Sequence, residues 1–188
     1  MNVQPVLAGK KIAILATDGF EFSELTSPRD TLIAAGATVH IISQKDGSIR
    51  GWSGKDWADT VAVDKTLQHA KAADYDGLVL PGGLINPDTL RQDEQAIRFI
   101  QAFFSDSANK PVAAICHGPW LLAEAGVLKG RKVTSYNSIK TDLKNAGAIW
   151  VDEQVVVDNG LVTSRTPDDL DAFNKKLLEE IREGRHAV

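Results

Sequence analysis

The sequence predicts an α/β fold with a mainly parallel, doubly wound central sheet, and two observations lead to this prediction. Short, nearly all-apolar runs recur along the chain without polar alternation, as expected for parallel strands covered on both faces. Helical stretches lie between these runs, and the alternation of strand and helix favours a parallel sheet between helical layers. At 188 residues, the chain suits a single domain over 1–188 and is short for two.

The expected elements follow in order along the chain. Strands are expected at 11–16, 38–43, 77–80 and 112–115, and helices at about 21–35, 65–73, 93–104 and 118–125. Gly36 ends the first helical stretch. Pro28 interrupts that stretch near its first turns, so this helix is expected to begin late or to bend there.

The C-terminal part of the chain carries a hairpin signal and then a helix signal. Asn159 and Gly160 lie between two β-rich runs within 155–164, which predicts a β-hairpin and an antiparallel edge to the sheet. Residues 166–169 then supply a capping threonine, a proline at the first helical position and acidic residues in the first turn. A last helix is therefore expected to run to about Glu183.

Charge and composition limit the classes of partner and the compartment that we expect for this protein. The net charge of −4 and the pI near 5.6 argue against nucleic acid as a required partner, which would call for clustered Lys and Arg. The first residues lack the apolar core of a signal peptide, and no apolar run is long enough to span a bilayer, so we expect a cytoplasmic protein without membrane attachment. The single cysteine cannot form an internal disulfide, which fits a reducing compartment.

That cysteine, Cys116, lies where a nucleophile would be placed. Within 110–122 an apolar strand breaks at Cys116 and an amphipathic helix begins at once, so the side chain faces the first N–H groups of a helix, which favour negative charge. We therefore expect a thiolate, the reactive form of cysteine. The alternative is a small buried hydrophobic residue. His117, Gly118 and Pro119 favour the functional interpretation, because they suit a constrained turn with a base beside the thiol.

Parallel sheets bind ligands at the carboxyl ends of their strands, so the loops that leave those ends belong together. The loops of interest span 18–24, 81–88 and 116–117. Gly82 and Gly83 let backbone N–H groups approach a substrate oxygen, and His117 adds the N–H just past the nucleophile. Two such donors would form an oxyanion hole. The alternative is that the Pro-Gly-Gly segment is only a tight turn.

The carboxylates near the first loop could act in opposite ways. A charged Glu24 beside Cys116 would raise the thiol pKa, whereas a protonated Glu24 in a poorly solvated pocket would donate a hydrogen bond to the sulfur and favour thiolate. Glu21 lies three residues earlier and would share one helix face with Glu24. A solvated helix face is the alternative for both residues.

The general base can be identified by excluding the other histidines. A papain-like triad needs a histidine well after the cysteine and held in the core. His40 falls in an expected strand, His69 in an expected surface helix and His186 in the tail. His117 is therefore the expected base, although adjacent side chains on a turn tend to diverge.

Together these residues resemble the DJ-1/PfpI superfamily, and within it the PfpI-like intracellular protease branch. The resemblance runs over nearly the whole chain. The segments that carry it are 19–25, 78–83, 114–119, 130–132, 145–148 and 162–170.

The resemblance implies a flavodoxin-like three-layer sandwich, a homodimer or a higher oligomer, and a cysteine on a strained elbow. It further implies an oxyanion hole from the N–H groups of Gly83 and His117, and a hydrogen bond from Glu24 to the cysteine. Protease-like members orient the histidine with a Glu from the neighbouring subunit. Here Asp88 stands at about that place, with a shorter side chain and shifted spacing. Trp120 would either wall the pocket or pack against the neighbouring subunit.

The expected function is that of a stress-response protein with a reactive cysteine. Its chemistry would be that of a cysteine-dependent, protease-like hydrolase or of a glyoxalase or deglycase, acting on a small electrophilic carbonyl or a peptide. The alternative is a non-catalytic redox sensor or chaperone whose cysteine is oxidised to sulfenic and sulfinic acid. No Gly-x-Gly-x-x-Gly or Walker-type loop follows the first strand, and we expect neither a cofactor nor a metal.

Overall fold

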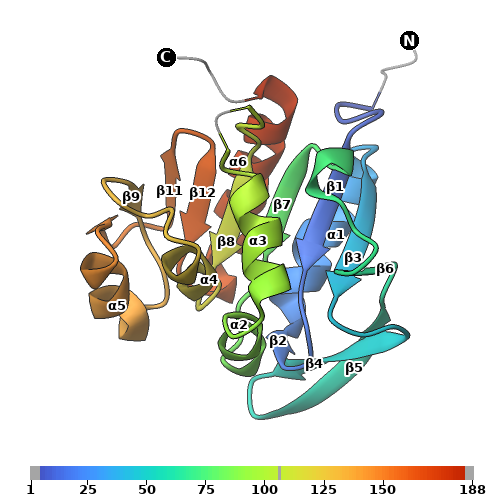
Figure 1. Cartoon of the computed structure of the whole chain (residues 1–188), viewed down its shortest axis with the longest axis horizontal. Helices are drawn as coiled ribbons and strands as arrows, with labels where there is room; N and C mark the ends of the chain where they lie inside the picture. The colour runs from blue at the N-terminus through green and yellow to red at the C-terminus, as the bar shows by residue number, and fades with distance from the viewer. Residues whose placement is uncertain (1–4, 106, 185–188) are drawn as a thin grey trace.

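The central sheet of the computed structural model, which describes residues 5–105 and 107–184, has seven strands in the order β11-β12-β8-β7-β1-β3-β6 (Figure 1). These strands are β1 (Lys11–Leu15), β3 (Thr38–Ser43), β6 (Lys65–Thr66), β7 (Gly77–Leu80), β8 (Val112–Ile115), β11 (Val155–Asp158) and β12 (Leu161–Ser164). Neighbouring strands are parallel except for β11 and β12, which pair antiparallel at one edge.

Helices cover both faces of this sheet, as Figure 1 shows. One layer holds α1 (Phe22–Ala34) and α6 (Leu170–Glu183), and the other holds α2 (Ile85–Leu90), α3 (Glu94–Ala102) and α4 (Pro119–Glu124), with α5 (Lys140–Asn145) beside α4. The predicted three-layer sandwich with a mainly parallel sheet is thus confirmed. No helix in the described ranges is both long enough and apolar enough to cross a membrane.

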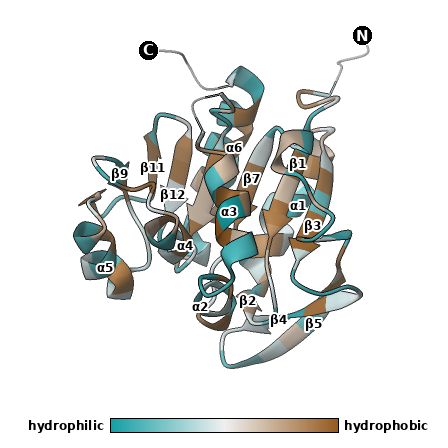
Figure 2. Cartoon of the chain, in the orientation of Figure 1, coloured by the Kyte–Doolittle hydropathy of each residue, from teal (hydrophilic) through white to brown (hydrophobic). Residues whose placement is uncertain are grey.

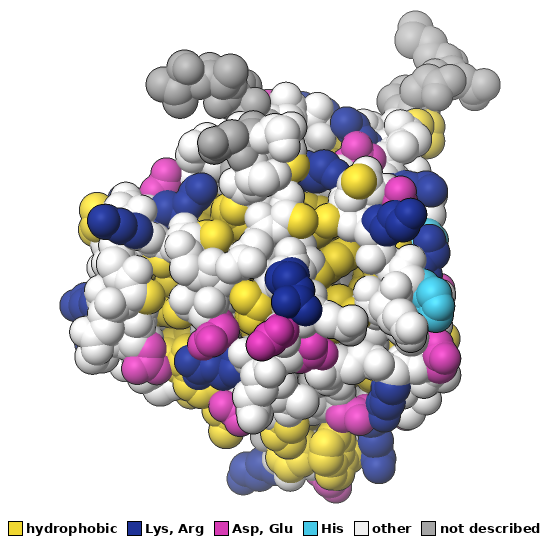
Figure 3. Space-filling model, in the orientation of Figure 1, with side chains coloured by type: hydrophobic (Ala, Val, Ile, Leu, Met, Phe, Trp, Pro, Cys, Tyr) yellow, Lys and Arg dark blue, Asp and Glu magenta, His cyan; other side chains and the backbone are white. Residues whose placement is uncertain are grey.

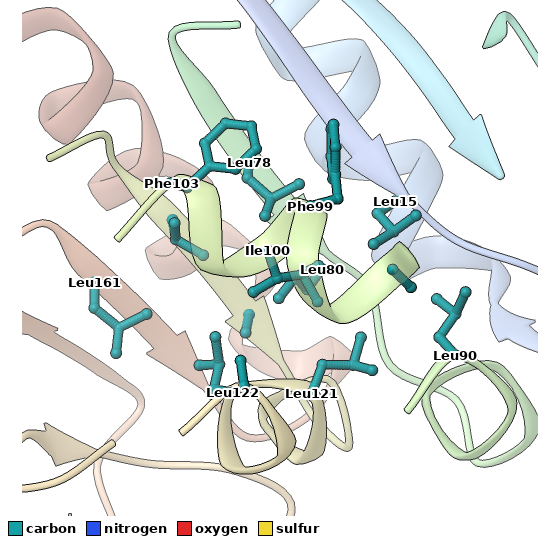
Figure 4. Packing of buried hydrophobic residues seen from close by; sticks show 14 of the residues in the cluster. Leu15, Leu78, Leu80, Leu90, Phe99, Ile100, Phe103, Leu121, Leu122 and Leu161 are labelled. Atoms are coloured by element: carbon teal, nitrogen blue, oxygen red, sulfur yellow. The ribbon is translucent and has the colours of Figure 1, made fainter. Parts of the chain in front are cut away.

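The strands are apolar throughout because each face of the sheet meets a helical layer. Leu78 and Leu80 of β7 point toward α3, whereas Val79 between them joins the core on the α1 and α6 side. Figure 4 shows Phe99 and Ile100 of α3 packed over this surface, and Figure 2 shows hydrophobic strands beneath helices with hydrophilic outer faces. Burial of each such side chain contributes roughly 1.5–3 kcal/mol.

The predicted C-terminal hairpin and last helix are confirmed, but Thr166 makes no side-chain capping hydrogen bond. Asn159 and Gly160 adopt φ values of 47° and 78°, the positive pair that a tight turn between β11 and β12 requires. A 3-10 turn over Pro167–Asp169 leads into α6. The buried Asp169 accepts from the backbone N–H of Arg165 at 3.0 Å and from its Nε at 2.9 Å, and so fixes the entry to that helix.

The expected helix at 65–73 and the expected late start of the first helix are both wrong. The expected helix at 65–73 is instead the short strand β6, followed by turns and a 3-10 helix over Ala72–Asp74, because the backbone of residues 65–67 bonds to the edge of β3. Pro28 does not delay the first helix, which already begins at Phe22. Leu25, Pro28 and Leu32 lie buried on one face of α1, and this packing offsets the hydrogen bond that proline cannot donate.

Several short elements were not expected. Strands β2 (Phe20–Glu21), β4 (Ser48–Ser53) and β5 (Asp56–Ala62) form a second sheet, in which β4 and β5 are an antiparallel hairpin. Strands β9 (Lys132–Val133) and β10 (Ile149–Trp150) pair with each other, and a 3-10 helix spans Asn137–Ile139. The loop that precedes this 3-10 helix contacts the carboxyl end of β8, where Cys116 lies.

Candidate active site

Cys116 occupies a sharp turn at the carboxyl end of β8, with φ at 62°. A non-glycine residue in this left-handed region costs roughly 1–2 kcal/mol and persists only when its surroundings impose it. Here the Cys116 N–H donates to the Ser164 carbonyl at 3.1 Å, and its carbonyl accepts from the Tyr136 N–H at 2.9 Å. Gly118 completes the elbow, because a Cβ there would lie 2.5 Å from the Leu80 carbonyl oxygen.

The Pro-Gly-Gly loop after β7 approaches Cys116 closely. A Cβ on Gly82 would lie 2.6 Å from Glu24 Oε2 and 2.7 Å from Cys116 Cβ, so only glycine fits between them. Gly83 has a φ of 79°, and a Cβ on it would collide with the Gly19 carbonyl oxygen. Both positions therefore require glycine, which has no side chain.

A buried asparagine holds this loop in place. Asn86 is fully buried, and its Nδ2 donates to the carbonyls of Pro81 at 3.0 Å and Gly82 at 3.1 Å. Its Oδ1 accepts from the Thr17 N–H at 2.8 Å, which ties the loop after β7 to the loop after β1. Two of the expected loops thus meet through one amide side chain.

Two backbone donors converge on the sulfur. The N–H groups of Gly83 and His117 both hydrogen-bond Cys116, and each of these bonds lowers the pKa of the thiol. These are the donors that the sequence singled out, and they come from the loops after β7 and β8. An oxyanion formed next to the sulfur would find both of them in place.

The Glu24 side chain is fully buried next to this site. Its Oε2 accepts a hydrogen bond from the Gly82 N–H at 2.8 Å. Its other oxygen has no hydrogen-bond partner within the described chain, and the Cys116 thiol is close enough to affect the pKa of the carboxyl. Burial, with a smaller contribution from the nearby charge of Glu21, raises the pKa of Glu24 to about 8, against the lowering effects of the Gly82 N–H and the Cys116 thiol. Glu24 is therefore protonated at neutral pH.

The thiol itself departs from the sequence-based expectation. Burial raises the pKa of Cys116, a charged Glu24 raises it too, and the N–H groups of Gly83 and His117 lower it without reversing the shift. The expectation of a depressed pKa overlooked this desolvation, because Cys116 is only 7% exposed. Protonation of Glu24 removes the opposing charge and supplies a donor to the sulfur. The two groups therefore titrate as a coupled pair.

His117 does reach the cysteine, although the two residues are adjacent. Its Nδ1 lies 3.2 Å from Cys116 Sγ, and its Nε2 lies 3.3 Å from Ser138 Oγ. The imidazole stacks on the Tyr136 ring at a centroid distance of 4.7 Å and meets the Trp120 ring edge-on at 5.1 Å. Burial lowers the pKa of His117, so the imidazole is neutral at neutral pH.

The other expected residues lie farther from the sulfur. Asp88 is exposed in the first turn of α2, and in the described part of the chain no hydrogen bond joins it to His117. Trp120 contacts the His117 ring and donates from Nε1 to Asp142 at 2.9 Å. The Arg91 guanidinium lies over the face of its ring. Glu21, expected on a helix face with Glu24, instead ends β2 at the position before α1 and makes no side-chain capping hydrogen bond.

The remaining histidines are engaged elsewhere or not described. His40 Nδ1 lies 2.9 Å from the Tyr75 hydroxyl, and His69 lies in a turn rather than in the expected helix, 2.9 Å from Thr66 Oγ1. His186 lies outside the described residues. Within those residues no group of three or more His, Cys, Asp or Glu side chains is arranged to hold a metal ion.

Three residues of the site were not predicted from the sequence. A polar Asn86 within an apolar stretch was a usable signal of a buried, hydrogen-bonded amide. Tyr136 and Ser138 gave no such signal, because only the tertiary fold brings them to His117.

Comparison with known proteins identifies similar chains. The model of the DJ-1/PfpI family matches residues 10–180. General stress protein 18 of Bacillus subtilis is 46% identical over 171 residues, which cover 90% of this chain and 96% of that protein. Protein/nucleic acid deglycase 2 of Escherichia coli is 48% identical over 171 residues, with the same coverage of 90% and 96%. The crystal structure of Drosophila melanogaster DJ-1beta superposes with a TM-score of 0.82 at 30% identity, covering 92% of this chain and 90% of that one.

Proposed function

Because the chain belongs to the DJ-1/PfpI family, we propose that it is a stress-response enzyme of glyoxalase or deglycase type, with Cys116 as nucleophile. Its substrates would be small 2-oxoaldehydes and their adducts with amines or thiols. Relatives named as a general stress protein and as a deglycase support this assignment.

The observation that carries the proposal is the set of groups around one sulfur. A protonated carboxyl from Glu24, two backbone N–H groups and a neutral imidazole all lie within reach of Cys116. Each of these groups has a role when a thiol adds to a carbonyl carbon. The carboxyl and the imidazole carry protons, and the N–H groups of Gly83 and His117 stabilise the oxyanion.

For a 2-oxoaldehyde the steps balance without an added oxidant. The thiol proton of Cys116 passes to His117 Nδ1 as the sulfur attacks the aldehyde carbon, and Glu24 gives its proton to the oxyanion, which yields a hemithioacetal. The Glu24 carboxylate left by this transfer removes the hydrogen on the former aldehyde carbon while His117 protonates the neighbouring carbonyl oxygen, which gives an enediol. Glu24 then returns its proton to the carbon that bears this oxygen, and the hydroxyl on the former aldehyde carbon loses its proton to His117. The resulting thioester of a 2-hydroxy acid is hydrolysed by water, which returns the thiol. One carbon is oxidised while its neighbour is reduced.

Peptide hydrolysis fits the site less well. Protonation of an amine leaving group benefits from a histidine that a carboxylate orients and stabilises as its cation. In the described chain the far nitrogen of His117 faces the uncharged Ser138 hydroxyl, and Asp88 could serve it only from a neighbouring subunit. A carbonyl substrate needs no such leaving group, which favours glyoxalase or deglycase chemistry.

We also propose that the protein is a homodimer. Leu84 and Ile85 directly follow the Pro-Gly-Gly loop and are 60% and 42% exposed. Figure 3 shows hydrophobic side chains gathered along the lower edge of the molecule, where α2 and the β4–β5 hairpin lie. Exposed apolar patches of this kind mark interaction surfaces.

A cytoplasmic location is supported by the free thiol, which a reducing compartment preserves.

One set of assays tests the proposed chemistry. Purified protein is compared on methylglyoxal, on glycated thiols or amines and on small peptide amides, with Cys116→Ser as the blank. We expect Cys116-dependent turnover of the first two substrate classes. Turnover of the peptide amides alone would favour the protease, and no turnover of any substrate would leave the redox-sensor interpretation.

A further inference from the structure

The half-buried imidazole of His117 contacts several side chains of its own subunit. Its ring lies on the face of Tyr136 and against the edge of Trp120, with centroid distances of 4.7 Å and 5.1 Å. Its two nitrogens lie 3.2 Å from Cys116 Sγ and 3.3 Å from Ser138 Oγ. Contacts on both nitrogens and on two sides of the ring leave the imidazole little freedom to rotate.

The polar contacts select one of the two ring orientations. A half-turn about the Cβ–Cγ bond would replace both nitrogens by ring carbons and would leave the sulfur and the Ser138 hydroxyl facing C–H groups. In the observed orientation both nitrogens have a hydrogen-bonding partner. The Ser138 hydroxyl is thus the second of two contacts that define the orientation.

The position of Ser138 is coupled to the nucleophile elbow. Ser138 lies in the 3-10 helix Asn137–Ile139, and the Ile139 N–H donates to the Tyr136 carbonyl at 3.2 Å. The Tyr136 N–H in turn donates to the Cys116 carbonyl at 2.9 Å. The segment that carries the hydroxyl is therefore fastened to the residue that carries the sulfur.

We propose that Ser138 is a positioning residue that sets the orientation and tautomer of His117, at the place where a triad would use a carboxylate. With the proton on Nε2 donated to Ser138 Oγ, the unprotonated Nδ1 faces the sulfur and can accept the thiol proton. Its importance for turnover rests on the proposed function, whereas its effect on the imidazole does not.

A hydroxyl in this place has a consequence that a carboxylate would not have. A carboxylate stabilises the imidazolium and raises the histidine pKa, but a neutral hydroxyl adds no negative charge. His117 is therefore kept as a neutral carrier of protons at neutral pH. This fits a reaction in which protons move between carbon and oxygen and no amine has to leave.

The test uses the full-length protein and variants at three positions. Ser138→Ala removes the hydroxyl, Ser138→Thr restores it, and Ser138→Asp supplies a carboxylate. Asp88→Asn tests the alternative orienting group, and Ser105→Ala, at an exposed serine elsewhere, is the matched control. Nitrogen-15 NMR of the His117 ring reports its tautomer and pKa, and methylglyoxal turnover reports kcat and KM separately.

We expect Ser138→Ala to lose the preference for a protonated Nε2 and to lower kcat about tenfold or more with little change in KM, because the base is misplaced while binding is kept. Ser138→Thr should recover both properties, and Ser138→Asp should raise the His117 pKa by about 1 unit or more. Asp88→Asn should keep the wild-type tautomer and pKa of His117, and Ser105→Ala should resemble the wild type in every measurement.

An unchanged His117 tautomer and pKa in Ser138→Ala would overturn the proposal, as would the same losses appearing in Asp88→Asn instead. The NMR readout does not depend on catalysis. If the wild type turns over no carbonyl substrate, the proposed function fails, yet the ring spectra still decide the role of Ser138.

Discussion

The carboxyl of Glu24 lies beside the thiol of Cys116 in a space closed to solvent. Glu24 is fully buried and Cys116 is 7% exposed, so two adjacent negative charges would be strongly disfavoured there. Burial raises the pKa of Glu24 to about 8. Over the neutral range Glu24 therefore keeps its proton, and this proton connects the stability of the fold with the reactivity of the sulfur.

The first prediction concerns stability against pH. The folded state keeps the Glu24 proton up to a pKa of about 8, whereas the unfolded chain loses it near the usual 4.5. The folded state thus binds more protons between these values, and the free energy of unfolding should fall as pH rises from about 5 to 8. At about 1.4 kcal/mol per pH unit, the loss amounts to a few kcal/mol. Glu24→Gln should show a smaller fall in urea unfolding measured across this range.

Glu124→Gln, at an exposed glutamate on α4, is the matched control and should keep the wild-type slope. If Glu24→Gln loses stability with pH as steeply as the wild type, then Glu24 is not the group that holds the proton.

The second prediction concerns the reactivity of the thiol. Gln in place of Glu24 keeps a hydrogen-bond donor beside the sulfur, whereas Leu removes it and leaves the desolvation of Cys116 unopposed. We therefore expect iodoacetamide to label Glu24→Leu several-fold more slowly than the wild type near neutral pH, and Glu24→Gln at a rate close to that of the wild type. Labelling rates against pH with mass detection measure this. Equal rates for the Leu variant and the wild type would remove Glu24 from the account.

The third prediction concerns the oxyanion hole. Gly83→Ala places a methyl group against the Gly19 carbonyl oxygen, so the loop must shift and its N–H must leave the sulfur. Loss of one such donor typically lowers kcat by about 10² to 10³. Gly54→Ala is the control, because Gly54 also has a positive φ, of 65°, but a Cβ there would meet no atom within 4 Å. Turnover of methylglyoxal should fall only in Gly83→Ala, and a comparable fall in both variants would indicate a general effect of backbone strain.

The layers of the fold were predictable because the central strands are apolar on both faces. Leu78 and Val79, for example, enter different cores, and a pattern without alternation already indicates this. The expected helix at 65–73 failed because its first residues complete the edge of β3, a tertiary interaction that outweighs a weak local preference. The β4–β5 hairpin escaped notice because only Ile49, Gly51 and Val61 of its two strands are buried.

The candidate site divides in the same way. Cys116, Gly82 and Gly83 were predictable because their roles depend on local backbone geometry, which leaves a mark on sequence. Ser138 was not, since it reaches His117 only through the fold. The predicted lowering of the Cys116 pKa was wrong for a related reason. The position of the cysteine before a helix can be read from sequence, but the burial that raises its pKa depends on every layer around the site.

The most direct test of the account is the rate at which lactate forms from methylglyoxal in the presence of wild-type protein and of Cys116→Ser. We expect the wild type to release lactate over many turnovers without added cofactor, and the serine variant to be indistinguishable from buffer. Equal rates for the two proteins would contradict the assignment of Cys116 as the nucleophile and, with it, the proposed function.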